Sequence, residues 1–186
     1  SDLYKAVVDD SIVLNNWLKN ASFETYAASA FTNWLLSGAG GTAAQDTTTV
    51  PVKHGSYTCK ITRVGTDTVL TQGITQVVAL EAAKGRSITF YCWVFASVAS
   101  AVCIALYDGT TRSKSDYHEG QSRWELLYVT ASIAEGATDF RVELRVETTN
   151  TSAYFDDARV RGFPKLYLYD LPSDFTREPS SVYFEN

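Results

Sequence analysis

Residues 154 to 160, Tyr-Phe-Asp-Asp-Ala-Arg-Val, form the stretch from which we predict the fold. Successive side chains of a strand point to opposite faces of a sheet, so a strand here places Tyr154, Asp156, Ala158 and Val160 on one face. That face is mostly apolar and is expected to contact a core. Because an ionised carboxylate is costly to bury alone, Asp156 is expected to meet a cation or several hydrogen-bond donors.

The segment from Asn20 to Glu24 is the expected partner of this stretch. We predict that it forms the first strand and lies beside the last one, with Phe23 in the same core and Glu24 at its rim. A calcium ion (Ca²⁺) between the carboxylates of Glu24 and Asp156 would satisfy both acids. The alternative is that each acid accepts hydrogen bonds from backbone N–H groups without a metal.

Composition limits the classes of function. The 186 residues fit one domain with a full hydrophobic core and room for extensions. The net charge is −5, with Lys and Arg scattered along the chain, so nucleic acid is not an expected partner. No apolar run approaches the roughly 20 residues of a membrane span, and the N-terminus has no signal-peptide core. We expect a soluble protein that contacts no membrane and is made in the cytoplasm or already processed.

Catalytic patterns are weak in this sequence. Its two histidines, His54 and His118, lack a second histidine at metal-binding spacing, and no Gly-x-Ser-x-Gly occurs. We therefore expect a protein that is not an enzyme. The cysteines lie in apolar, strand-like contexts without C-x-x-C spacing and are expected to be buried free thiols: Cys59, Cys92 and Cys103.

The remaining pattern indicates an all-β chain. Residues 87–96 are the most β-prone stretch and are expected to form a central strand with apolar groups on both faces. Residues 140–147 alternate strictly, with a core face opposite Arg141, Glu143 and Arg145. Eight or nine such segments with almost no helix predict an antiparallel β-sandwich or jelly roll. Trp34 and Trp124 are expected in its core.

Six short motifs in order carry a resemblance to a known family. They are Asn-x-x-Phe-Glu at 20–24, Trp34, His-Gly-Ser-Tyr at 54–57, Ser-Ile-Thr-Phe-Tyr-Cys-Trp-Val at 87–94, Trp124 and Tyr-Phe-Asp-Asp at 154–157. Residues 18–161 thereby resemble jelly-roll carbohydrate-binding modules of families four, nine and twenty-two. Residues 1–17 are then an N-terminal arm, and residues 162–186 an extended C-terminal tail.

The resemblance implies a site and a function. It implies a structural calcium at Glu24 and Asp156, for which Asp46 is the only candidate third acid. It also implies a non-catalytic glycan-binding groove on the concave sheet, where six residues are expected to line the site: Tyr91, Trp93, Tyr107, Arg141, Glu143 and Arg145. The alternatives are that Trp93 belongs to the core and that the alternating charges form a solvated face.

The flanking segments suggest a second hypothesis. An arm, an aromatic tail and free thiols around one jelly roll would suit a structural component of a phage virion, either a capsid decoration or a tail component. The expected location is then the virion surface or the cell exterior. The expected partners are a polysaccharide or surface glycan and, through the termini, other protein chains.

Overall fold

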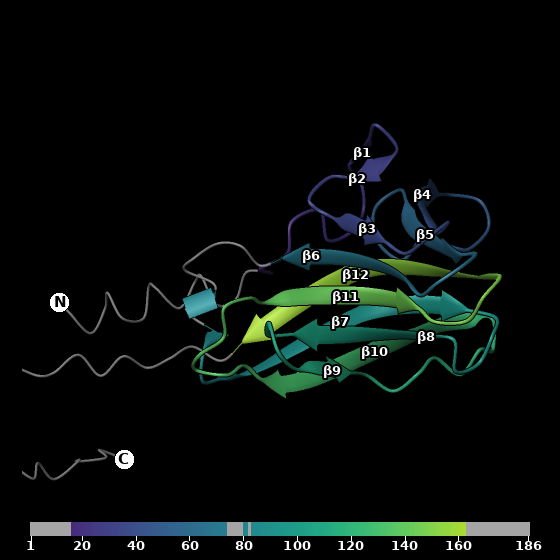
Figure 1. Ribbon diagram of the computed structural model, residues 1–186. Helices are drawn as coiled ribbons and strands as arrows, with labels where there is room; N and C mark the ends of the chain where they lie inside the picture. Colours follow the sequence, from purple (N-terminus) through teal and green to yellow (C-terminus); the bar gives the residue numbers. More distant parts are fainter. Residues whose placement is uncertain (1–15, 74–79, 82, 163–186) are drawn as a thin grey trace, which may run out of the picture.

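The computed structural model describes residues 16–73, 80–81 and 83–162, so most of the predicted arm and nearly all of the predicted tail lie outside the described residues. The described part is an antiparallel β-sandwich, as predicted, whose two five-stranded sheets are stacked layers in Figure 1. One sheet has the order β10 (Arg123–Ser132), β7 (Ser87–Ala96), β12 (Thr151–Gly162), β5 (Thr58–Arg63) and β4 (Thr42–Asp46). The other has the order β3 (Leu35–Ser37), β6 (Thr68–Gly73), β11 (Arg141–Val146), β8 (Val102–Tyr107) and β9 (Arg112–Lys114). A small hairpin of β1 (Tyr26–Ala27) and β2 (Ala30–Phe31) projects from the sandwich.

Strict alternation along the strands builds the core between the sheets. In β7 every second side chain is buried, and in β11 the three apolar positions are fully buried. The inward residues of these two strands are Ile88, Phe90, Cys92, Val94, Ala96, Val142, Leu144 and Val146. All three cysteines are free and buried, as predicted. The polar positions of β7 and β11 consequently face outward from opposite sides of the sandwich.

The last strand departs from the simple alternation that the sequence predicts. The pairing of β12 with β7 shifts between Asp156 and Arg159, and Asp157 has a φ of 50°. A bulge of this kind inserts extra backbone and changes which face the following side chains occupy. Phe155, Ala158 and Val160 therefore point into the core, whereas Asp156 lies on the outer face opposite Trp93. The prediction that Asp156 shares a face with Ala158 and Val160 was wrong for this reason.

The segment from Asn20 to Glu24 lies beside the last strand, but it is not a strand. Asn20 and Phe23 both have positive φ values, and the Phe23 N–H closes a turn onto the Asn20 carbonyl at 3.2 Å. The Asn20 side chain stabilises this turn through hydrogen bonds to the backbone of Thr25 and Thr32. The turn brings the Ala21 carbonyl to the N–H of Ala158, and Phe23 is fully buried as predicted.

Two residues assigned from sequence to the arm are attached to the sandwich. The Asn16 side chain donates to the Ala158 carbonyl and accepts from the Val160 N–H. Trp17 packs edge-on against Phe140, with ring centroids 6.4 Å apart. The segment around Asn16 thus occupies the side of β12 that β5, which pairs only up to Phe155, leaves open.

No helix in the described part of the chain is long and apolar enough to cross a membrane.

Candidate functional site

Among the described residues, the outer surface of β7 and β10 carries the largest group of aromatic side chains outside the core. The antiparallel register places Tyr91 opposite Tyr128, Trp93 opposite Leu126 and Phe95 opposite Trp124. Because these positions alternate with buried ones, all six side chains lie on the outer face of one sheet. We call this surface the aromatic face: Tyr91, Trp93, Phe95, Trp124, Leu126 and Tyr128.

The two ends of the aromatic face differ in accessibility. Phe95 packs edge-on between Trp124 and Tyr154, with centroid distances of 5.8 and 6.0 Å. At the other end, Tyr128 is 68% exposed and Leu126 is 46% exposed. Such large apolar groups gathered on one surface indicate a binding site. Trp124 lies half-buried on this outer face, so its predicted place in the core was wrong, whereas Trp34 is in the core as predicted.

The chain between β4 and β5 crosses over the middle of the aromatic face. We call residues 47–57 the strap. The Trp124 indole N–H donates to the Pro51 carbonyl at 2.8 Å, and the Lys53 ammonium lies 3.9 Å from the centre of the Trp93 ring. One face of Trp93 is therefore covered by Lys53. Tyr128 is the most exposed ring of this face, and the half-buried Tyr91 lies opposite it on the adjacent strand.

Asp156 holds the strap in place through backbone hydrogen bonds. One carboxylate oxygen accepts from the N–H groups of Lys53 and His54 at 2.8 and 2.9 Å, and the other accepts from the Asp157 N–H at 2.7 Å. Burial raises the pKa of the Asp156 carboxyl to about 6, although these three hydrogen bonds oppose the rise. The sequence-based expectation of several donors around this acid is therefore met by backbone N–H groups.

Glu24 fixes the far end of the strap in the same manner. Its carboxylate accepts hydrogen bonds from the backbone N–H groups of Ser56 and Tyr57 at 3.0 to 3.2 Å. Gly55 lies against this carboxylate with a φ of 76°, and a Cβ there would come within 2.2 Å of a Glu24 oxygen. A side chain at this position would adopt a strained backbone conformation and displace the Glu24 carboxylate, so glycine is favoured there.

The donor set does not fit the calcium site expected from sequence. All four carboxylate oxygens of Glu24 and Asp156 face N–H donors, whereas calcium requires six to eight oxygens directed at one point. Asp46, the candidate third ligand, caps the backbone of Thr48 and Thr49. Among the described residues, no group of three or more His, Cys, Asp and Glu side chains is arranged to hold a metal. Calcium at Glu24 and Asp156 stays a prediction without support from the geometry.

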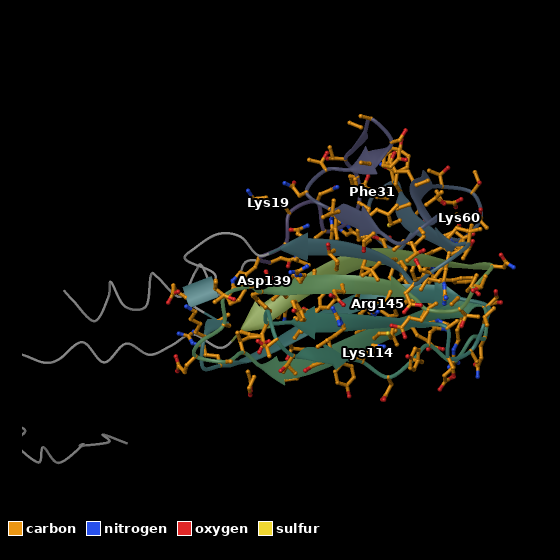
Figure 2. The ribbon with its side chains drawn as sticks, in the orientation of Figure 1. Lys19, Phe31, Lys60, Lys114, Asp139 and Arg145 are labelled. Atoms are coloured by element: carbon orange, nitrogen blue, oxygen red, sulfur yellow. The ribbon has the colours of Figure 1, made fainter. Side chains whose placement is uncertain are left out.

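The six residues expected from sequence to share one sheet are divided between two. Tyr91 and Trp93 lie on the aromatic face, but Tyr107, Arg141, Glu143 and Arg145 lie on the outer surface of the opposite sheet. The expectation of a single groove was wrong because alternation identifies outward positions but not the sheet to which they belong. Figure 2 labels Arg145 and Lys114 on this second surface.

Charges on the second surface neutralise one another. Glu143 is 2% exposed and pairs with Arg112 and Arg145, each at 2.7 Å. Glu147 pairs with Arg145 and Lys114 and accepts a hydrogen bond from Tyr117. Burial raises the pKa of Glu147, but these hydrogen bonds outweigh burial and hold the pKa at about 2. We call this network the ion-pair face: Arg112, Lys114, Glu143, Arg145 and Glu147.

Tyr107 and Arg141 are also engaged on this side. The Tyr107 ring lies between the guanidinium groups of Arg112 and Arg141, each 4.9 Å from its centre. Arg141 also pairs with Asp139. A shallow depression of about 320 Å³ lies beside Arg141, lined by residues that include Leu35, Thr71 and Asp139. It is open and carries no unpaired charged group among its lining residues.

Neither histidine is placed for catalysis. His118 is fully buried, with Nε2 3.0 Å from the Arg123 carbonyl and Nδ1 accepting from the Gly120 N–H at 2.8 Å. Both ring nitrogens therefore serve to shape the loop before β10. His54 belongs to the strap, where its backbone N–H binds Asp156.

Sequence reasoning missed seven residues of the aromatic face and its margin: Phe95, Trp124, Leu126, Tyr128, Lys53, Arg159 and Arg161. Alternation in residues 124–130 places Leu126 and Tyr128 on the same side as Trp124, and this signal was available. Lys53, Arg159 and Arg161 had no such signal, because the strap and the bulge bring them to this face.

Comparison with known proteins shows likeness in fold. No protein-family model matches the sequence, and no curated protein sequence does. The module TmCBM61, solved in complex with β-1,4-galactotriose, matches with a TM-score of 0.59 at 15% identity, over 80% of this chain and 99% of that one. The CBM22-1 xylan-binding domain of Paenibacillus barcinonensis Xyn10C matches with a TM-score of 0.60 at 14% identity, over 80% of this chain and 94% of that one.

A phage protein has the same fold. The enzymatically active domain of Bacteriophage CBA120 tailspike protein 4 matches with a TM-score of 0.60 at 14% identity. The match covers 80% of this chain but only 21% of the tailspike chain. The described chain thus has the jelly-roll fold of carbohydrate-binding modules, as the sequence motifs predicted, and the same fold occurs in a phage tailspike protein.

Proposed function

We propose that this chain is a non-catalytic module that binds a polysaccharide or surface glycan on its aromatic face. The observation that carries the proposal is the exposed ring of Tyr128, which lies opposite the half-buried Tyr91 on the adjacent strand, with the exposed Leu126 beside them. The fold shared with carbohydrate-binding modules supports it.

The chemistry of the face suits a sugar ring. Aromatic rings offer flat apolar surfaces on which the C–H faces of a sugar can stack, while polar groups at the margin bind its hydroxyls. Arg159 and Arg161 supply such groups next to Tyr91. Thr89 and Thr130, hydrogen-bonded to each other at 2.8 Å, continue the polar margin.

The acids near this face do not form a hydrolytic pair. Glycoside hydrolysis needs two carboxyl groups that reach the substrate from either side of the scissile bond. Asp157 is bound to Arg159 at 2.8 Å through both of its oxygens, and Asp156 is buried under the strap. Binding without catalysis is therefore the function that these residues support.

A glycan array tests the proposal, with Tyr128→Ala as the decisive variant. Removing a stacking ring of this exposure should weaken binding about tenfold, the equivalent of roughly 1.4 kcal/mol. Tyr117→Ala is the matched control, because Tyr117 is an exposed tyrosine that contacts the ion-pair face. Equal losses in both variants, or an array with no bound glycan, would contradict the proposal.

The second candidate role is display on a larger particle. In a phage virion, the jelly roll would serve either as a structural scaffold or as the domain that binds a glycan. The tailspike likeness favours it. Assembly through the termini predicts a solution mass for the full chain well above 20.5 kDa, measured by light scattering. A strictly monomeric chain would oppose assembly of this chain with itself.

A further inference from the structure

We infer that the glycan bound by the aromatic face is anionic and carries carboxylate groups of the uronic-acid type. This inference rests on the proposed glycan-binding function and adds the chemical class of the ligand. It follows from cations beside the accessible tyrosines that no carboxylate of the described chain neutralises.

Two cations flank the accessible part of the aromatic face. Lys53 lies over Trp93, and Arg161 lies 5.5 Å from the centre of the Tyr91 ring. Thr89, the register partner of Arg161, and Trp93 are four positions apart along β7, which corresponds to about 14 Å of strand. The Tyr91 and Tyr128 pair lies between these two positions. A ligand stacked on the tyrosines would therefore meet a positive charge toward each end.

These cations have no ion-pair partner within 4.0 Å in the described part of the chain. Each instead lies over an aromatic ring. A ring attracts a cation through its quadrupole but has no net charge, so the positive charge remains available to a ligand. Both Lys53 and Arg161 are exposed.

The acids of the same surface are already bound. Asp157 forms a two-pronged pair with Arg159, and Asp156 accepts three backbone hydrogen bonds. Asp46 lies at the β4 edge, where hydrogen bonds from Thr49 and Thr48 and the charge of Lys60 outweigh burial and hold its pKa below the ordinary value. The accessible part of the face consequently offers the charged donors of Lys53 and Arg161, and these nearby acids of the described chain are not free to balance them.

A donor-rich face selects an acceptor-rich ligand. A neutral sugar presents hydroxyl groups that both donate and accept, whereas a carboxylate only accepts. Carboxylates form strong charge-assisted hydrogen bonds with guanidinium and ammonium groups. The whole chain has a net charge of −5, so two unneutralised cations on this surface are a local feature and not a consequence of composition.

The experiment compares the binding of acidic polysaccharides with the binding of their uncharged, carboxyl-reduced forms. Binding of the full chain is measured to polygalacturonate, alginate and hyaluronan, each beside its carboxyl-reduced form. We expect at least one acidic polymer to bind, and its reduced form to bind about tenfold more weakly. Raising salt from about 50 mM to about 500 mM should weaken the acidic complex, because exposed charges are screened.

Charge-neutralising variants locate the effect. Lys53→Gln and Arg161→Gln should each weaken binding of the acidic polymer about tenfold, and they should weaken any binding of the reduced polymer by a smaller factor. Lys19→Gln is the matched control, because this exposed lysine is attached through its backbone to Gln72 on the opposite sheet. Thermal melts of all three variants check that they fold.

The outcomes separate this inference from the proposed function. Equal binding of acidic and reduced polymers, lost in Tyr128→Ala, would overturn the anionic ligand and leave glycan binding intact. Binding only to neutral polysaccharides would do the same. Absence of binding to every acidic and neutral polymer would overturn both. If Lys19→Gln weakened binding of the acidic polymer as much as Arg161→Gln, the effect would come from the overall charge of the protein. The assignment of Lys53 and Arg161 as the residues that bind the carboxylates would then be wrong.

Discussion

The two outer surfaces of this sandwich use charged and aromatic side chains in opposite ways. On the ion-pair face, Glu143 and Arg145 are almost wholly buried and pair with each other, Glu143 also pairs with Arg112 of β9, and Arg145 also pairs with Glu147. On the aromatic face, Tyr128 and Leu126 are exposed, while Lys53 and Arg161 have no carboxylate partner in the described part of the chain.

This difference shows which surface is free to bind. Charged groups that already have partners would have to give them up before contacting a ligand, and separating a buried pair is costly. Exposed rings and unneutralised cations lose little when they bind and gain contacts with the ligand. We therefore expect substitutions on the ion-pair face to act on stability and those on the aromatic face to act on binding.

The largest effect is expected on the ion-pair face. Glu143→Ala removes a buried carboxylate and leaves Arg145 without one of its partners, so the free energy of unfolding should fall by about 3 kcal/mol. Urea denaturation measures this loss. Glu119→Ala, which breaks an exposed pair with Arg123, is the control and should cost less than about 1 kcal/mol.

A loss below about 1 kcal/mol in Glu143→Ala would show that the network does not stabilise the sheet. Glycan binding should be unchanged in the same variant. A loss of glycan binding in a folded Glu143→Ala protein would contradict the proposal that the ion-pair face acts on stability and the aromatic face acts on binding.

The two faces should also respond to pH in opposite directions. The pKa of Asp156 is raised to about 6, so its contribution to stability is present below the unfolded-state pKa and is lost as the pH rises through about 6. The pKa of Glu147 is lowered to about 2, so its contribution is present above the unfolded-state pKa and is lost as the pH falls toward 2. Each contribution is on the order of 2 to 3 kcal/mol.

Difference measurements isolate these contributions. The stability of wild type minus that of Asp156→Asn should decrease between about pH 4 and pH 6, and the same difference for Glu147→Gln should increase from about pH 2 to pH 5. Unfolding free energies across this pH range provide the measurement. The same sign for both variants would contradict the assignment.

A smaller change in stability is expected for Tyr128→Ala. Because this ring is 68% exposed, its removal should change the free energy of unfolding by less than about 0.5 kcal/mol. Chemical denaturation alongside the glycan array separates the two readouts. A loss above about 2 kcal/mol would show that Tyr128 supports the fold, and it would remove the distinction between the faces.

The smallest effect is expected from chelation. If backbone N–H groups alone satisfy Glu24 and Asp156, a chelator should leave the melting temperature unchanged within about one degree. Calorimetry with and without added calcium measures this. A fall of several degrees that calcium reverses, and that is absent in Asp156→Ala, would establish the calcium site that the sequence resemblance implies.

Local alternation made much of the fold predictable. Residues 87–96 were predicted to be a strand and form β7, and the apolar and charged faces of residues 140–147 were assigned correctly. The period-two pattern contains this information because a strand buries every second side chain. It failed at Asn20–Glu24, where positive φ values form a turn, and at Asp157, where a bulge interrupts the alternation.

The sequence by itself indicated the longer strands and the buried thiols, and it offered as outward positions Tyr91, Trp93 (with the core as its alternative), Arg141, Glu143 and Arg145. Only the tertiary structure decided that the first two lie on one sheet and the last three on the other. It also placed Lys53 on Trp93 and bound the Lys53 backbone to Asp156, 103 residues away. The physical reason is that alternation is a local property of the backbone, whereas sheet membership and charge neutralisation depend on contacts between residues distant in sequence.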